Sequence, residues 1–273
     1  MKKVLEAVSV AALLGTAAAA YATPSTTYWT PATTYTQPFL IPHITYDTYV
    51  AEKGMLQNDY GLTIGILPWD KLQGEVGVDV FMPTARPPAL LLPSGKPAYT
   101  KDNLYLNGKL TLPENAFASW QPGVSVGLQS IGFTKNYSDY NHLHGTIAKT
   151  FPYVGNLGVG GYYGGNKNLY VSSDGKTERS GFMLAWTSPD LNVKVTGLDK
   201  IVFVADYASG KNVFGAGGVG AVFYFTPAID ILTGPVWFND SKLFKSLYGT
   251  DFMWTVQLDV DIDVSRPKPA PKT

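Results

Sequence analysis

The feature that most restricts the fold of this chain is an alternation of apolar and polar residues on both sides of one turn. The two arms span residues 59–66 and 75–82, and the break between them is Pro68–Gly74. Every second residue in both arms is apolar, as at Leu62 and Val78, and most residues between them are glycine, threonine or acidic. A period of two residues puts the apolar side chains on one face, which is typical of a β-hairpin. The fold therefore depends on what that apolar face contacts.

The same alternation returns near the end of the chain. From Phe252 to Val264 the apolar residues alternate with polar ones, among them Asp259, Asp261 and Asp263. Strands of soluble proteins usually have about five or six residues. A tilted strand of about nine to eleven residues crosses a bilayer, so the final run is long enough to span one.

The ends of the chain differ from this alternating region. Two lysines precede an apolar, alanine-rich run that ends at Ala20-Tyr21-Ala22, an A-x-A cleavage site. The next residues are rich in Thr, Pro and Tyr without an apolar period, which favours a flexible leader. The predicted division is a signal peptide (1–22), a flexible N-terminal leader (23–37), the alternating region (38–264) and a Pro/Lys-rich C-terminal tail (265–273).

Composition excludes several classes of protein. Without residues 1–22 the chain has 19 basic and 20 acidic residues, a formal charge of −1, so it lacks the basic excess of nucleic-acid-binding proteins. It contains no cysteine, which rules out disulfides and thiolate catalysis. An exported chain without disulfides needs another source of stability, and a large closed sheet would supply it.

The breaks between the alternating segments are themselves of two kinds. Those at Pro68, Pro113–Pro122, Pro152, Pro189 and Pro227 contain proline, and most are short. The intervening breaks are mostly longer and more polar, and among them only the one over residues 83–103 contains proline. Short turns on one rim and longer loops on the other are typical of transmembrane barrels. We therefore predict an all-β fold, an up-and-down antiparallel transmembrane β-barrel of about 12 strands with both termini at the short-turn rim.

The apolar face decides between this barrel and a soluble, exported β-sandwich, in which it would be buried against a second sheet. The opposite face carries few full charges, and only 15% of the chain is charged. Aromatic residues also gather near strand ends, as expected for girdles at two lipid interfaces. These aromatics are Tyr60, Trp69, Trp120, Phe151, Tyr153, Trp186, Phe225, Trp237 and Phe252.

With the predicted export signal, the chain resembles bacterial outer-membrane β-barrel proteins over roughly residues 42–264. The resemblance is one of architecture, without a family motif. It implies an outer-membrane location, contact with outer-membrane lipid and lipopolysaccharide, and insertion by the outer-membrane machinery. Many such barrels end on an aromatic residue that this machinery reads, whereas this chain continues through Ser265 to Thr273.

The polar face of each strand then lines the lumen. The last strand and the first three would form an acidic wall, and Lys109, Arg179, Lys194 and Lys200 a basic one across the barrel, which favours a channel for small polar or cationic solutes. Alternatively, the charges pair and fill a closed interior, as in a non-conducting structural or adhesin-like barrel. The candidate pore-lining residues are His43, Asp47, Glu75, Asp79, Lys109, Arg179, Asp259, Asp261 and Asp263.

An enzymatic function is less favoured. His142 and His144 share one face, with Ser138 and Asp139 nearby, and an outer-membrane lipid hydrolase needs Ser and His within hydrogen-bond reach. Both histidines have lumen parity, however, and no G-x-S-x-G sequence is present. No catalytic, cofactor-binding or metal-ligating set is predicted, and no cofactor. The apolar, proline-rich stretch within 83–103 would either fold inward as a constriction or plug, or pack on the rim.

Overall fold

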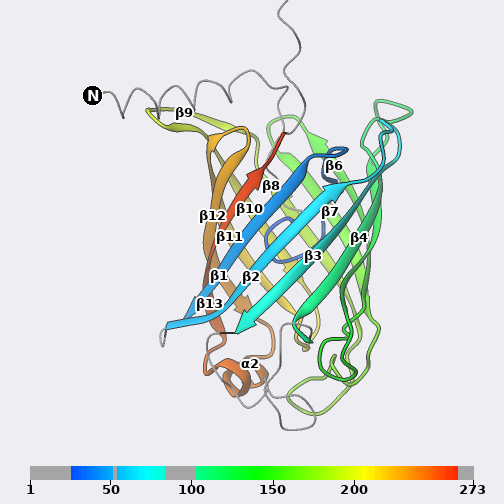
Figure 1. Ribbon diagram of the computed structural model, residues 1–273, viewed down its shortest axis with the longest axis vertical. Helices are drawn as coiled ribbons and strands as arrows, with labels where there is room; N and C mark the ends of the chain where they lie inside the picture. The colour runs from blue at the N-terminus through cyan, green and yellow to red at the C-terminus, as the bar shows by residue number, and fades with distance from the viewer. Residues whose placement is uncertain (1–25, 52–53, 84–101, 264–273) are drawn as a thin grey trace, which may run out of the picture.

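The computed structural model describes residues 26–51, 54–83 and 102–263, and it shows one antiparallel sheet closed into a barrel (Figure 1). Each wall strand pairs with its neighbours in the chain, and pairing of β1 with β13 and of β10 with β11 completes the ring. The predicted all-β, up-and-down barrel of 12 strands is therefore confirmed. The wall strands are β1 (Pro42–Ala51), β2 (Gly54–Gly65), β3 (Gln73–Pro83), β4 (Leu104–Leu112), β5 (Gly123–Gly132), β6 (His142–Phe151), β7 (Gly155–Gly164), β8 (Ser180–Thr187), β10 (Leu198–Ala208), β11 (Ala216–Thr226), β12 (Ile229–Phe238) and β13 (Phe252–Asp261).

The two rims differ as the breaks in the sequence predicted. The proline-containing turns lie at the upper rim in Figure 1, together with the short strand β9 (Leu191–Val195), which forms a hairpin with β10. The other rim carries the polar loops and the helix α2 (Ser241–Tyr248). The region around Val193 is thus a β9–β10 hairpin. Among the described residues, no helix is long and apolar enough to cross a membrane.

The outer face of the wall is apolar and uncovered. Leu62 is 46% exposed, Ile147 is 50% exposed and Leu258 is 38% exposed, so these side chains are not buried between stacked sheets. Aromatic side chains lie near both rims, with Trp120 and Tyr153 at the proline rim and the contacting pair Trp237 and Phe252 at the other. An outward apolar band between aromatic girdles is the surface of a barrel that spans a lipid bilayer.

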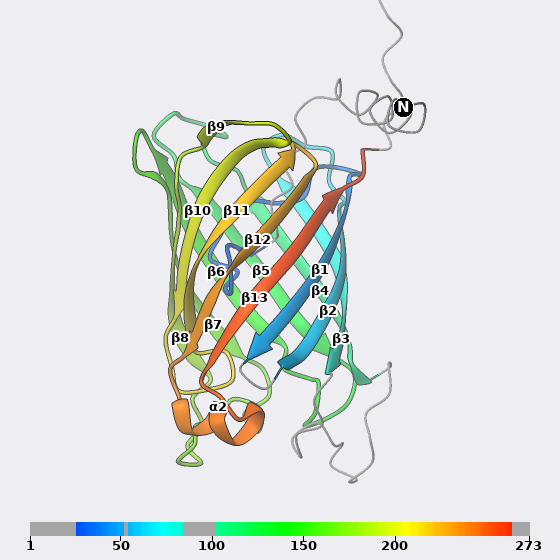
Figure 2. The same ribbon diagram turned by 90° about the vertical axis from the view of Figure 1, so that its left-hand side faces the viewer.

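Residues 26–41 correct one prediction. The described part of the expected flexible leader does not extend away from the fold; it runs through the barrel interior, as the dark blue segment of Figures 1 and 2 shows. Tyr28 and Thr30 are 2% and 0% exposed. The prediction failed because side chains of the wall replace water as hydrogen-bond partners of this segment. The predicted signal peptide, the C-terminal tail and the stretch within 83–103 fall mainly on residues 1–25, 264–273 and 84–101, outside the described residues.

The helix α2 closes part of the polar rim and is fixed by its N-cap, Asp240. The Asp240 carboxylate accepts hydrogen bonds from the amides of Leu243, at 3.0 Å, and Ser173, at 2.7 Å, which joins the β12–β13 loop to the β7–β8 loop. Phe244 stacks on Phe238 with ring centroids 3.5 Å apart. Partial burial raises the pKa of Asp240, but the two amide hydrogen bonds outweigh this and hold it below its usual range.

We expect Asp240→Ala to destabilise α2 by about 1 kcal/mol, because the N-cap acceptor is lost. Amide hydrogen exchange at Leu243 and Ser173 should accelerate while exchange in the wall strands stays unchanged. Asp240→Asn is the matched control, since Asn caps helices about as well as Asp. Because the folded pKa is depressed, the stabilisation exists above the unfolded value of about 3.9 and disappears as the pH falls through the lower folded value. Faster exchange in the Asn variant than in the Ala variant would contradict this role.

Candidate functional site

The candidate functional site is the barrel interior, where strand register brings most of the predicted pore-lining residues together. His43 on β1 is opposite Asp261 on β13. Its Nδ1 lies 2.9 Å from Asp261 Oδ1 and its Nε2 lies 3.2 Å from Asp259 Oδ1. All three side chains are buried. The alternation of β1 and β13 thus produces a buried cluster with one imidazole and two carboxylates.

Glu75 and Lys109 form a second buried pair. They are register partners on β3 and β4, and Lys109 Nζ lies 3.2 Å from Glu75 Oε1. The second oxygen of Glu75 accepts a hydrogen bond from the Gln37 amide at 2.7 Å. Lys109 therefore neutralises an acid on the neighbouring strand, in place of forming part of a basic wall across the barrel.

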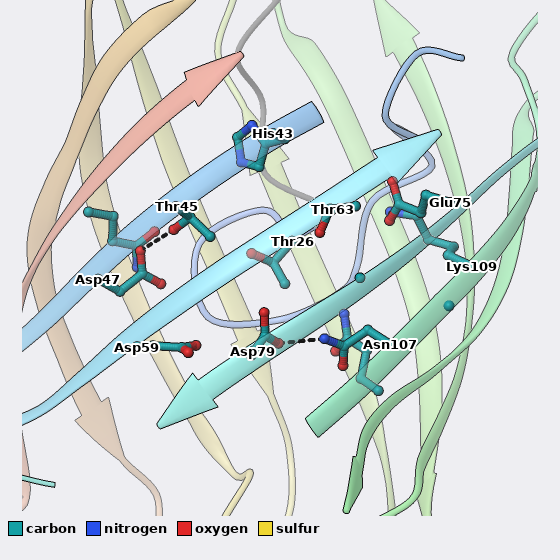
Figure 3. Close-up of a pocket in the computed structure, with 14 residues that line it drawn as sticks. Thr26, His43, Thr45, Asp47, Asp59, Thr63, Glu75, Asp79, Asn107 and Lys109 are labelled. Atoms are coloured by element: carbon teal, nitrogen blue, oxygen red, sulfur yellow. Dashed lines mark hydrogen bonds and ion pairs between the residues drawn. The ribbon is translucent and has the colours of Figure 1, made fainter. Parts of the chain in front are cut away.

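Asp47 and Asp79 line a cavity of about 100 Å³ on the β1–β4 side of the interior (Figure 3). Asp47 accepts a hydrogen bond from the Thr45 hydroxyl at 2.6 Å, and Asp79 accepts one from the Asn107 amide at 2.5 Å. A third carboxylate, Asp59, is the register partner of Asp47 and also lines the cavity. Asp59 was not among the candidate pore-lining residues, although it alternates with the outward-facing Tyr60 and therefore has lumen parity. Thr26, His43, Thr63, Glu75, Lys109, Gln129 and Gln257 also line the cavity.

The remaining candidates lie elsewhere. Arg179 precedes β8 at the polar rim, where its guanidinium donates to the Gly164 and Gly165 carbonyls at 2.7 and 2.6 Å and lies 4.4 Å from the ring centroid of Tyr163. Tyr163 is on the outer face, so Arg179 does not belong to the lumen. Asp263 follows the end of β13 and is half-buried.

Of the two other lysines expected on the basic wall, Lys200 faces the interior and pairs with Asp190 at 2.8 Å. Lys194 lies on β9 in the rim hairpin. With Lys109 paired to Glu75 and Arg179 at the rim, the described residues do not form the expected basic wall.

Wall residues hold the internal segment 26–41 at several points. Asp206 on β10 accepts hydrogen bonds from three successive amides, those of Tyr28, Trp29 and Thr30, at 3.1, 2.9 and 2.7 Å. The Gln37 side chain donates to Asp261 at 2.8 Å. A carboxylate that accepts several amide hydrogen bonds fixes a loop firmly. Residues 26–41 are therefore fixed to the wall and form a structural part of the barrel interior.

Glycines of the wall make room for the Tyr28 ring. A Cβ at Gly218 on β11 would lie 2.2 Å from Tyr28 Cε1, and one at Gly220 would lie 2.7 Å from Cε2. A Cβ at Gly234 on β12 would lie 3.0 Å from the Tyr28 hydroxyl. Any larger residue at Gly218 would clash with the ring. The glycine-rich composition of residues 215–220 thus has a packing role in the barrel.

His142 and His144 also face the interior. His142 Nδ1 lies 2.8 Å from the Tyr170 hydroxyl, and the ring packs on Phe214 with centroids 4.0 Å apart. Within the described residues, neither nitrogen of His144 has a hydrogen-bond partner. The Ser138 hydroxyl accepts from the Thr134 amide in the β5–β6 loop. These residues therefore do not assemble the Ser–His pair that lipid hydrolysis would need.

In the part of the chain that the structure describes, no group of three or more His, Asp or Glu side chains is arranged to hold a metal ion. What the interior does contain is a set of carboxylates that outnumbers the basic groups near them, arranged along β12, β13, β1, β2 and β3.

No protein-family model matches the sequence, and no curated protein matches it. Among solved structures, an outer membrane channel from Pseudomonas putida F1 is similar at 11% identity over 84% of this chain and 98% of that one, with a TM-score of 0.43. The NanC porin has 8% identity over 82% of this chain and all of its own, with a TM-score of 0.49.

An enzyme is also among the similar structures. Outer membrane phospholipase A from Escherichia coli has 13% identity over 83% of this chain and 91% of its own, with a TM-score of 0.45. The strand pairing itself establishes the architecture, which is a closed antiparallel β-barrel of 12 strands, with no specific family identified.

Proposed function

We propose that this protein is an outer-membrane channel for small polar solutes, with an interior narrowed by its own residues 26–41. The observation that carries the proposal is the combination of an apolar, uncovered outer face with a polar interior that still contains a cavity. A wall of this kind satisfies all its backbone hydrogen bonds within lipid. In this setting the outer-membrane lipids contact the outer face, and the insertion machinery and lipopolysaccharide are the expected partners during and after assembly.

The position of the cavity supports a route along one side of the barrel. The cavity lies against β1–β4, whereas the Tyr28 and Trp29 side chains of the internal segment pack with the apolar residues of β10–β12. The interior is thus divided into a filled side and a partly open side. Solutes that pass the open side meet carboxylates, amides and hydroxyls, which favours small polar molecules over apolar ones.

A second candidate, a non-conducting structural barrel, is favoured by one specific observation. The internal segment and the paired charges, such as Glu75 with Lys109, fill much of the lumen. Interiors of small barrels are commonly packed with side chains in this way.

Planar-bilayer recording separates the two functions. Pure, refolded full-length protein is expected to give discrete conductance steps, and a heat-modifiable band on gels would show that the barrel is folded in the same preparation. If folded protein gives no steps, and a form without residues 26–37 gives none either, the channel proposal fails and the structural barrel is the better description.

A further inference from the structure

We propose that Asp230 and Asp259, which face each other inside the barrel, bind a monovalent metal cation that enters from the cavity. The two residues are register partners on β12 and β13. They are 0% and 1% exposed. Directly opposite residues of an antiparallel pair have Cβ atoms about 4.5–5.5 Å apart, a spacing at which one cation can contact both carboxylates.

The reason to expect a ligand is the lack of hydrogen-bond donors. None of the four carboxylate oxygens of Asp230 and Asp259 accepts a hydrogen bond from the described residues. Buried charges are normally paired or coordinate a metal, because removing them from water is costly. Like charges placed opposite each other on neighbouring strands are destabilising in addition.

The basic groups nearby do not balance these charges. His43 lies 3.2 Å from Asp259, but its other nitrogen is engaged with Asp261 at 2.9 Å. One imidazole therefore serves two carboxylates. Lys200, the basic residue of this side of the wall, is ion-paired with Asp190 at 2.8 Å. Two basic groups thus face four carboxylates, those of Asp190, Asp230, Asp259 and Asp261, so the cluster can take up further positive charge.

The class of cation follows from the ligands. Carboxylate oxygens are hard ligands suited to alkali and alkaline-earth ions. A divalent ion such as Ca²⁺ takes about six to eight oxygens, and no group of three or more acidic or histidine side chains in the described chain is arranged to hold a metal. Mg²⁺ gives up its waters reluctantly and needs octahedral geometry, which does not suit two carboxylates that are 0% and 1% exposed. A larger and more easily dehydrated ion of sodium or potassium size suits them better.

Acidic residues line the cavity from which a cation would reach Asp230 and Asp259. His43 and Gln257, the immediate neighbours of Asp259 on the interior surface, form part of the cavity wall. Asp47, Asp59 and Asp79 line the same cavity. A cleft lined by charges of one sign concentrates ions of the opposite sign. The inference deepens the proposed channel, since it would make cations the favoured solutes, but binding itself does not require conduction.

The test is therefore a binding measurement on the full-length, refolded protein in detergent micelles. Unfolding is followed in NaCl, in KCl and in N-methylglucamine chloride at equal concentration, so that ionic strength and anion stay constant. The unfolding temperature is expected to be higher by about 2–4 °C in one of the alkali salts. Equal unfolding temperatures in all three salts would overturn the proposal, because the pair would then be stable without a metal cation. Stabilisation by millimolar CaCl₂ but by neither alkali salt would also overturn it.

Variants locate the effect. Asp230→Asn and Asp259→Asn are each expected to abolish the difference between alkali and N-methylglucamine salts. Each variant removes a buried charge, so folding should be retained. Glu114→Gln is the matched control at the proline rim, where Glu114 pairs with Lys149 at 3.0 Å, and it should keep the full difference. A difference that persists in both Asn variants contradicts the site.

Failure of the cation site and failure of the channel proposal give different experimental results. Cation-dependent stability without conductance steps would leave the site and remove the channel. Conductance steps without cation-dependent stability would leave the channel and remove the site.

Discussion

A form of the protein that lacks residues 26–37 is expected to conduct several times more current per channel than the full chain. The segment crosses the lumen, and its residues Tyr28 and Trp29 fill the side formed by β10–β12, where they pack against wall residues. Its removal would join this space to the cavity of about 100 Å³ beside β1–β4. Barrel diameter grows with strand number, and 12 strands leave an interior that side chains of the wall alone do not fill here. Single-channel recording in planar bilayers measures the change.

A single substitution tests the same point without shortening the chain. Tyr28→Ala would remove the ring that lies against Gly218 and Gly220, so conductance should rise. Tyr28→Phe is the matched control, because it keeps the ring and loses only the hydroxyl that donates to the Pro235 carbonyl at 3.1 Å. Equal conductance of the full chain, the shortened form and the Tyr28→Ala variant would show that the segment does not narrow the route.

Ile147→Arg is expected to lower the free energy of unfolding in a lipid bilayer by about 2–4 kcal/mol, the cost of an arginine on the lipid face near the midplane. Ile147 is near the middle of β6 and 50% exposed, and its register partners Val124 and Val159 are also exposed. In a soluble protein, the same change at a half-exposed position would alter stability by about 0.5 kcal/mol or less. The size of the loss in the free energy of unfolding therefore shows whether the outer face contacts lipid or water.

The measurement is reversible urea unfolding of protein inserted in phosphatidylcholine vesicles. Ile147→Val is the control, because it keeps the position apolar and should change stability little. The adjacent Thr146 and Ala148 are buried inside the barrel. Because Ile147 points the other way, neither variant should disturb the packing of the interior. An Arg variant as stable as the Val variant would rule out lipid contact at this face.

The sequence predicts the wall because the wall depends on local order. Leu62, Ile147 and Leu258 face outward since alternation with a period of two is a property of neighbouring residues, and the proline-containing breaks alternate with polar ones for the same reason. These two patterns are sufficient for the barrel, its rims and its strand number. They also assign His43, Glu75, Asp259 and Asp261 to the interior.

The contacts inside the barrel could not be predicted in this way. Asp206 binds the Thr30 amide across 176 positions of the chain, and no local pattern in a Thr- and Pro-rich segment marks it as an interior element. Lys109 meets Glu75 in place of a distant acid because strand register sets them opposite each other. Asp230 and Asp259 are likewise brought together by the pairing of β12 with β13. Alternation determines which way each side chain points, and only closure of the sheet decides which side chains meet.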